Sequence, residues 1–235
     1  MILKDLPVKQ IVSHITSKEL SVDEVVEYYL ERIKKFNHSL NAIVSLRSEG
    51  EIREEARNKK LHKSKEGKEM LLFGLPLAVK DLTDVEGLPT SYGLPELKNN
   101  IANQNSIIVD RLINHGAIII GKTNTPEFGI SSHTKNKLFG VTANVFDLSK
   151  SAGGSSGGAA SAVASSMVPF ADGSDMMGSC RNPAAYANLY GFRPTPGLIP
   201  EKRDFKPETT SPILSTLGCL EIGRASCRER VSTSV

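Results

Sequence analysis

The chain has 235 residues, of which 39% are hydrophobic and 23% are charged, and its net charge is +3 at pH 7. This apolar content is sufficient for a core, so composition excludes a wholly disordered chain. The small net charge does not indicate a nucleic-acid partner, and no stretch is long and apolar enough to span a membrane. Because no apolar segment follows the first charged residues, we expect no secretory signal and a cytoplasmic protein.

The charges are unevenly distributed along the chain. Residues 1–70 contain 14 Lys or Arg and 12 Asp or Glu, which is typical of solvated helices. We expect these helices to pack on a more apolar core formed by residues 71–220. Residues 221–235 resemble the in-frame translation of a sequencing adapter, so we interpret them as a non-native tail. On this interpretation the natural chain continues beyond Leu220, and missing strands would leave an exposed sheet edge and poor solubility.

Three helices are predicted in the N-terminal part. Pro7 can open the first helix, because its missing N–H costs nothing in the first turn. Residues 21–24 (Ser-Val-Asp-Glu) form a capping box, and apolar residues at a period of 3.6 follow, so we predict a helix over 21–36. A third, highly charged helix is expected from Glu49 to about His62.

Beyond Phe73 the pattern indicates strands. Short apolar runs bounded by glycine at 75–79 and 117–120 are typical of buried strands. An amphipathic helix is predicted between them over 107–114. A strand, a helix and a second strand make a βαβ unit, so we expect an α/β fold with a parallel or mixed sheet. Residues 182–200, rich in Pro, Gly and aromatic residues, are expected to form an ordered loop with one helical turn.

Two motif matches lack the context that their chemistry needs. Residues 116–123 fit the phosphate-binding pattern G-x-x-x-x-G-K-[ST], but Ala and three Ile between the glycines favour a strand over a cradle. Residues 154–158 fit the G-x-S-x-G elbow, whose catalytic His follows the Ser in the chain. All five histidines precede Ser156. The three cysteines form no C-x-x-C pair, so neither a disulfide frame nor a zinc site is indicated.

The Gly/Ser tract at 149–161 has two interpretations. Its composition is that of a flexible linker. However, it passes directly into the helix-forming run Ala162-Val-Ala. Glycines that open a helix, with serines in its first turn, would place N–H donors and hydroxyls around one point.

Several segments in order resemble the amidase signature family. They are residues 78–81 around Lys80, 121–129, 153–158 around Ser155, 175–184 around Ser179, and 191–195. The resemblance runs from about residue 5 to Leu220. It implies a mixed β-sheet surrounded by helices, and hydrolysis of a small-molecule amide or ester through an acyl-enzyme, with no metal and no cofactor. From the small net charge we expect no nucleic-acid partner. The full-length protein could form a homodimer.

The resemblance also implies roles for single residues. Ser179 would be the nucleophile, and Ser155, after a cis peptide bond, would pass the proton between Ser179 and Lys80. The backbone N–H groups from about Met176 to Ser179, including those of Met177 and Gly178, would form the oxyanion hole. Most relatives have Gly where this chain has Met177, and a backbone of positive φ there would strain the Met side chain.

The basicity of Lys80 can be argued from its own surroundings. A lysine has a pKa of ~10.4 and must lose ~2–3 units to act as a base near neutral pH. The preceding apolar residues (Leu75, Leu77 and Val79) would desolvate the amine and lower its pKa. Asp81 should face the opposite side of the strand. Without the family, a lysine that extends from a strand end to water is the competing interpretation.

The residues around Ser179 are expected to have structural rather than catalytic roles. Asp175 and Arg181 can pair across the turn and fix the loop that presents Ser179. Cys180 is expected to be a small packed hydrophobic side chain, because thiol catalysis would need a His partner that the motifs do not contain.

Two other functions stay open at this point. The glycine-rich segments could belong to a non-catalytic domain that binds a ligand or nucleotide. An amidotransferase component that acts on charged tRNA would have the same Ser-Ser-Lys triad, although the near-neutral charge disfavours a large RNA partner.

Overall fold

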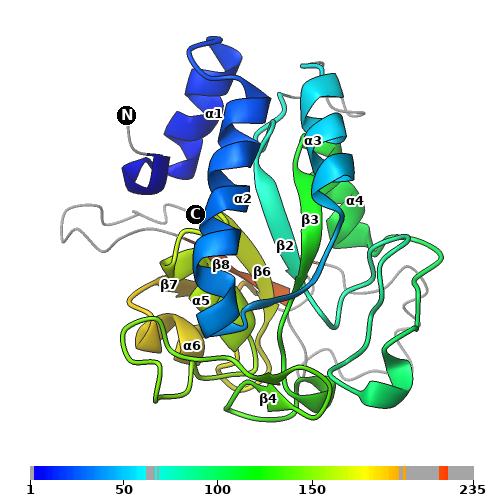
Figure 1. Ribbon diagram of the computed structural model, residues 1–235, viewed down its shortest axis with the longest axis vertical. Helices are drawn as coiled ribbons and strands as arrows, with labels where there is room; N and C mark the ends of the chain where they lie inside the picture. Colours follow the sequence, from blue (N-terminus) through cyan, green and yellow to red (C-terminus); the bar gives the residue numbers. More distant parts are fainter. Residues whose placement is uncertain (1–2, 62–66, 68, 196–197, 200–216, 222–235) are drawn as a thin grey trace.

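The computed structural model describes residues 3–61, 67, 69–195, 198–199 and 217–221 (Figure 1). Its α-helices are α1 (Val8–Thr16), α2 (Val22–Leu40), α3 (Glu49–Asn58), α4 (Ile107–Asn114), α5 (Gly157–Ala164) and α6 (Arg181–Tyr186). Its strands are β1 (Ile43–Leu46), β2 (Pro76–Lys80), β3 (Ile118–Thr123), β4 (Lys135–Asn136), β5 (Gly140–Val141), β6 (Phe170–Ser174), β7 (Tyr190–Phe192) and β8 (Leu217–Glu221). Short 3₁₀ turns lie at Leu3–Asp5, Pro95–Leu97 and Glu127–Gly129. None of the described helices combines the length and the apolar character needed to cross a bilayer.

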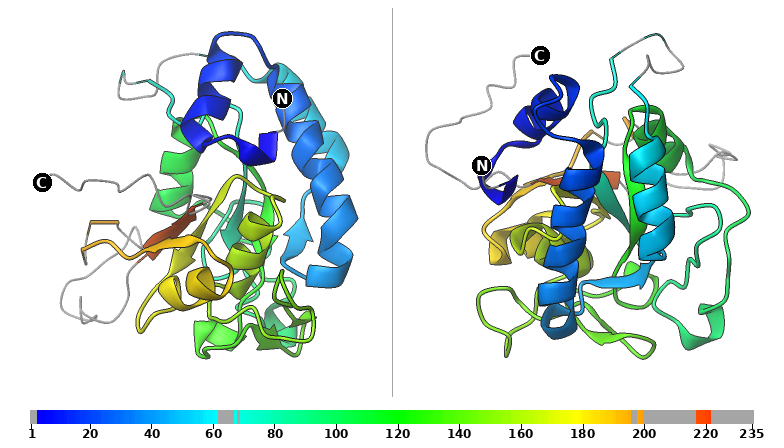
Figure 2. Two further views of the ribbon diagram at one scale, coloured as in Figure 1. Left: turned by 90° about the vertical axis from the view of Figure 1, so that its left-hand side faces the viewer. Right: turned by 45° about the horizontal axis from the view of Figure 1, so that its top comes forward.

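The central sheet is mixed, as the sequence predicted. β3 lies in the middle, parallel to β2 and antiparallel to β1. The connection from β2 to β3 contains α4, so the predicted βαβ unit is confirmed. A second sheet has the order β6-β8-β7 with antiparallel neighbours. β2 contacts β6, so the two sheets lie side by side in the molecule (Figures 1 and 2).

The strand β2 has two buried faces, because side chains alternate along a strand. Leu77 and Val79 pack with Val109 of α4 in one hydrophobic cluster. Ala78 belongs to the larger cluster on the other face, which also includes residues of α2 and α5. Lys80 is two residues after Ala78 and therefore faces the same side as Ala78, toward α5. This alternation places the amine in the interior of the molecule.

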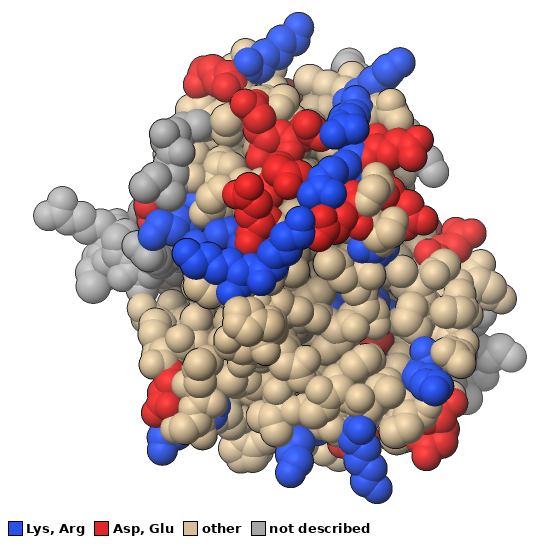
Figure 3. All heavy atoms as spheres, viewed as in Figure 1, with Lys and Arg blue, Asp and Glu red and all other residues tan. Residues whose placement is uncertain are grey.

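The helices α2 and α3 form the charged side of the molecule. The capping box of α2 is present, with Ser21 accepting the Glu24 N–H and Glu24 accepting the Ser21 N–H. Arg53 of α3 pairs with Glu27 of α2 at 2.7 Å, and Lys34 pairs with Glu49 at 2.9 Å. Figure 3 shows the charged side chains gathered over the upper part of this face, where α2 and α3 lie, while the lower part is mostly uncharged.

The structure differs from the sequence-based expectations at several places. Pro7 is the N-cap residue of α1, one position before the helix. Helix α3 ends at Asn58 rather than near His62, which lies outside the described residues. Strand β1 was not predicted, because only its first residue is buried and its alternation is incomplete. The expected loop after Asn182 contains a strand, β7, as well as the turn of α6.

The expected tail lies almost wholly outside the described residues. Its first residue, Glu221, ends β8 and pairs with Phe170 and Tyr190. A non-native origin of the segment therefore stays a prediction, and so does poor solubility.

Candidate active site

Lys80, at the end of β2, is the centre of a buried group of hydroxyls. Its side chain is only 1% exposed. The Nζ atom lies 2.7 Å from Ser155 Oγ, 2.8 Å from Ser156 Oγ and 2.9 Å from Ser174 Oγ. A lysine that extended to water would be exposed, so that interpretation of Lys80 is wrong. The segments that meet here are far apart in sequence, since Lys80 and Ser155 are 75 residues apart.

The environment of Lys80 favours the neutral amine. Burial disfavours the ammonium and lowers the pKa of Lys80 to about 8, although the negative charges of Asp172 and Asp175 oppose the shift. At pH 7 roughly a tenth of the molecules therefore carry the neutral amine, far more than for an ordinary lysine. The Nζ atom donates to all three hydroxyls, and on losing a proton it gains a lone pair that can accept the proton of Ser155.

Ser155 and Ser156 form the entrance to helix α5. The peptide bond between Gly154 and Ser155 is cis, as the family resemblance implies. Ser156 is the N-cap residue of α5, which consists almost entirely of small residues and is buried. Gly158 needs this small size, because a Cβ there would lie 2.3 Å from Asn124 N. The tract is thus a packed helix start, and the linker interpretation is wrong.

The backbone of Ser179 lies beside this helix start. The Ser179 carbonyl accepts the Ser156 N–H at 3.1 Å. The side chain is partly exposed, and no hydrogen bond of its hydroxyl is found among the described residues. The structure thus shows a direct contact between the side chains of Lys80 and Ser155. Ser179 is linked by its backbone carbonyl to Ser156, the residue after Ser155.

Asp175 fixes the turn that carries Ser179. Arg181 donates to both of its carboxylate oxygens at 3.0 Å, and the N–H groups of Gly178 and Cys180 donate to it at 2.7 and 3.1 Å. Burial opposes ionisation of Asp175, but these hydrogen bonds outweigh it and hold its pKa at about 2. The predicted pair of Asp175 and Arg181 is confirmed, and it anchors both ends of the turn.

The same turn bears the N–H groups predicted for an oxyanion hole. The Gly178 N–H is engaged by Asp175. Those of Met176 and Met177 have no protein acceptor within the described part of the chain. Positive φ occurs at Gly178 (109°) and not at Met177, so the methionine is accommodated without backbone strain. Its side chain is 86% exposed.

Three buried groups near Lys80 also bear on the sequence-based reasoning. Asp81 faces away from Lys80, as expected, and its carboxylate accepts hydrogen bonds from the N–H and hydroxyl of Ser91. Cys180 is buried, and burial raises the pKa of its thiol to about 12, which agrees with a packed, unreactive side chain. Asp172 of β6 was not predicted. Its carboxylate accepts the Lys80 N–H at 2.7 Å, and a single acid in an apolar strand gives no local signal of such a contact.

The other motif matches are not sites. Gly121 and Lys122 lie within β3 and are fully buried, so the phosphate-binding pattern has no loop. Lys122 instead donates to Thr90 Oγ1 at 3.1 Å and lies 3.7 Å from Asp81 Oδ1. No histidine contacts Ser156 in the described residues, and these residues contain no group of three or more His, Cys, Asp or Glu that could hold a metal ion.

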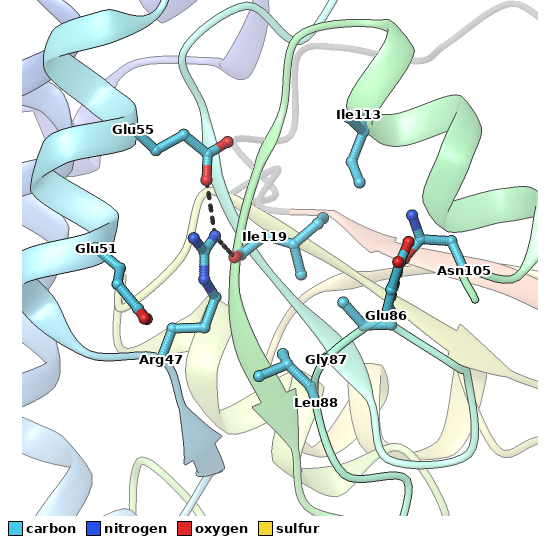
Figure 4. Close-up of a pocket in the computed structure, with 10 residues that line it drawn as sticks. Arg47, Glu51, Glu55, Glu86, Gly87, Leu88, Asn105, Ile113 and Ile119 are labelled. Atoms are coloured by element: carbon cyan, nitrogen blue, oxygen red, sulfur yellow. Dashed lines mark hydrogen bonds and ion pairs between the residues drawn. The ribbon is translucent and has the colours of Figure 1, made fainter. Parts of the chain in front are cut away.

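A pocket of about 410 Å³ lies elsewhere, between α3, β3 and the segment after β2 (Figure 4). Arg47 extends across it and donates to Glu55 and to the Ile119 carbonyl. None of the hydroxyls around Lys80 lines this pocket. Its walls hold charged pairs rather than a nucleophile with a base, so we do not associate it with the chemistry of Lys80.

Comparison with protein families matches residues 24–220 to the family described as Amidase. The chain belongs to the amidase signature family. An acylamidase of Rhodococcus erythropolis is 43% identical to it over 83% of the chain and 41% of the relative. The A component of a glutamyl-tRNA(Gln) amidotransferase from Caldanaerobacter subterraneus is 39% identical over 85% of the chain and 40% of the relative.

Solved structures of the amidase signature family have the same fold. A bacterial aryl acylamidase matches with a TM-score of 0.81 and 33% identity, over 92% of this chain and 44% of the other. The 6-aminohexanoate cyclic dimer hydrolase, solved with its substrate, matches with a TM-score of 0.82 and 26% identity, over 92% of this chain and 43% of the other. The chain thus spans about two fifths of the length of the curated amidase and amidotransferase relatives that it matches.

Proposed function

We propose that the protein hydrolyses carboxylic amides through an acyl-enzyme formed on Ser179, with Ser155 and Lys80 completing the catalytic group. The observation that carries the proposal is the 2.7 Å contact between a fully buried lysine and the serine after the cis peptide bond. A buried lysine whose pKa lies near 8 can accept a proton at neutral pH. The membership of the family and the acylamidase relative support an amide as substrate.

The proposed reaction uses the hydroxyls, the amine and the backbone N–H groups described above. The Ser179 hydroxyl gives its proton to Ser155 Oγ, while the Ser155 proton moves to Lys80 Nζ, and the Ser179 oxygen bonds to the carbonyl carbon of the amide. The negative charge on the carbonyl oxygen is stabilised by the N–H groups of Met176 and Met177, with Gly178 holding the turn. Lys80 returns the proton through Ser155 to the leaving amine, and water then hydrolyses the ester on Ser179.

Trapping the nucleophile tests this assignment. A sulfonyl fluoride or fluorophosphonate should label Ser179, as mapped by mass spectrometry. Ser179→Ala and Lys80→Ala should each abolish both the labelling and the hydrolysis of every amide that the parent protein cleaves. Ser132→Ala, which changes an exposed serine in a neighbouring loop, should have no effect. Full activity of Ser179→Ala would refute the assignment.

A second candidate is a transferase reaction, because several relatives are components of glutamyl-tRNA(Gln) amidotransferases. Transfer would begin with the same acyl-enzyme, which water would again hydrolyse, but the released ammonia would pass to another acceptor instead of leaving into solution. Hydrolysis of simple aryl amides by the protein alone would favour the amidase. Glutamine cleavage that requires a partner and a charged tRNA would favour the transferase.

A further inference from the structure

Asp172, in the middle of β6, is a buried carboxylate that the proposed reaction does not use. It is 5% exposed. Its Oδ1 atom accepts the backbone N–H of Lys80 at 2.7 Å, and its Oδ2 atom accepts the hydroxyl of Thr83 at 3.5 Å. β2 and β6 lie side by side but belong to different sheets. The Asp172 side chain therefore bridges the junction of the two sheets at the residue that bears the amine.

The contacts of Asp172 are those of an ionised carboxyl group. The Lys80 backbone N–H can only donate, so Oδ1 is an acceptor there, and an ionised carboxylate accepts at both of its oxygens. Burial raises the pKa of Asp172 above its usual value, and the Lys80 N–H and the positive charges of Lys80 and Lys122 limit this rise. None of the ion pairs between described residues uses Asp172, so its charge acts on its surroundings without a dedicated partner.

Two buried lysines on neighbouring strands differ in how their charge is balanced. Lys122 lies 3.7 Å from the carboxylate of Asp81. Among the described residues, the hydrogen-bond partners of the Lys80 Nζ atom are all hydroxyls. When Lys80 takes up a proton during the reaction, no carboxylate of the described residues pairs directly with the new positive charge. The buried carboxylate of Asp172, which accepts the backbone N–H of Lys80, is then well placed to stabilise that charge.

The other titratable groups around Lys80 do not replace Asp172. Asp175, after β6, is held by Arg181. Cys180, before α6, has its thiol pKa raised to about 12 by burial and is neutral. Lys122 of β3 is positive and would act in the opposite direction. Asp81, next to Lys80 in the chain, faces the other side of the strand and contacts Lys122.

We propose that Asp172 is a positioning residue for Lys80, holding its backbone at the sheet junction and supplying the negative charge that stabilises its protonated form. The role rests on the proposed function of Lys80 as the base. It assigns Asp172 no contact with substrate, and it predicts an effect on the pH dependence of the reaction rather than on the recognition of the amide.

Asp172→Asn is the decisive variant, because it keeps the shape and an amide oxygen for the Lys80 N–H while it removes the charge. The rate at which a fluorophosphonate labels Ser179 should rise with pH as Lys80 loses its proton. Loss of the nearby anion should move the midpoint of that rise down by about one pH unit. Thr83→Val is the matched control, since it removes the other hydrogen bond to Asp172 and keeps the charge, and its midpoint should stay unchanged. A folded Asp172→Asn protein with an unchanged midpoint would overturn the proposal.

Two measurements separate this inference from the proposed function. If the unaltered protein is not labelled at Ser179, the proposed function fails, and NMR titration of the Lys80 side chain then decides the role of Asp172 by itself. The Lys80 titration should again move down in Asp172→Asn. If that variant does not fold, the carboxyl ¹³C signal of Asp172 is followed in the unaltered protein. A carboxyl that stays protonated between about pH 6 and 9 would refute the inference.

Discussion

Replacing Lys80 by Met should make the protein more stable while it abolishes activity. Burial lowers the Lys80 pKa from 10.5 to about 8. At about 1.4 kcal/mol per pKa unit, this shift corresponds to about 3 kcal/mol against the folded state wherever the lysine is protonated in both states. Methionine has a similar length and no charge to desolvate, so most of this cost should be absent in Lys80→Met.

The pH dependence of this stability difference follows from the change in the Lys80 pKa on folding. Because the folded pKa is lower than the unfolded one, the unfolded chain binds the extra proton between about pH 8 and 10.5, and the unaltered protein gains stability as the pH rises through this window. The penalty is fully present below about pH 8. The advantage of Lys80→Met in the free energy of unfolding should therefore shrink by about 2 kcal/mol between pH 7 and pH 9.5.

Urea unfolding of both proteins at the two pH values measures this difference, since other lysines and tyrosines titrate equally in both. Lys122→Met is the matched control. Lys122 is also buried, but it lies 3.7 Å from Asp81, and its removal leaves that carboxylate buried without a cation. Lys122→Met should therefore be destabilised by about 3 kcal/mol. A Lys80→Met protein less stable than the parent at pH 7, or a difference that does not change with pH, would refute the reasoning.

Two further predictions concern packing and the Ser179 turn. Gly158→Ala should lower the free energy of unfolding by about 2 kcal/mol or more in urea titrations, because its Cβ would lie 2.3 Å and 2.5 Å from the backbone N and O of Asn124, which cannot rotate away. Gly50→Ala, whose Cβ meets nothing within 4 Å, should not be destabilised, and equal losses in the two variants would contradict the packing argument. Arg181→Met should raise the Asp175 pKa from about 2, so the parent should be the more stable protein at pH 6 and lose this advantage as the pH falls through about 3.8 to 2. Melting temperatures at several pH values test this, and an advantage that persists at pH 2 would show that Arg181 acts in another way.

The elements that the sequence predicted correctly are those with a local signal. The capping box and the regular apolar stripe identify α2, and glycine-bounded runs of branched apolar residues identify β2 and β3. Strand β1 has four residues with only the first one buried. It becomes a strand because β3 offers its free edge, which is tertiary information that no local pattern contains.

The residues of the candidate site also separate into those with a local sequence signal and those without one. Lys80, Ser155 and Ser179 were predicted because they stand in motifs, and the apolar residues before Lys80 indicated its burial. Ser174 and Asp172 could not be predicted, since Ser174 meets Lys80 from 94 positions away and Asp172 from 92 positions away. Their roles depend on β6 lying beside β2, and the apolar pattern of either strand alone does not specify that neighbour.

The burial of Lys80 has a consequence for synthesis of the chain. Its neighbours Ser155, Ser156 and Ser174 are added many residues after it, so an emerging polypeptide carries a solvated amine with ordinary basicity. The lowered pKa of Lys80 arises only when the two sheets have joined and buried the amine. Folding itself therefore creates the weakly basic amine on which the proposed reaction depends.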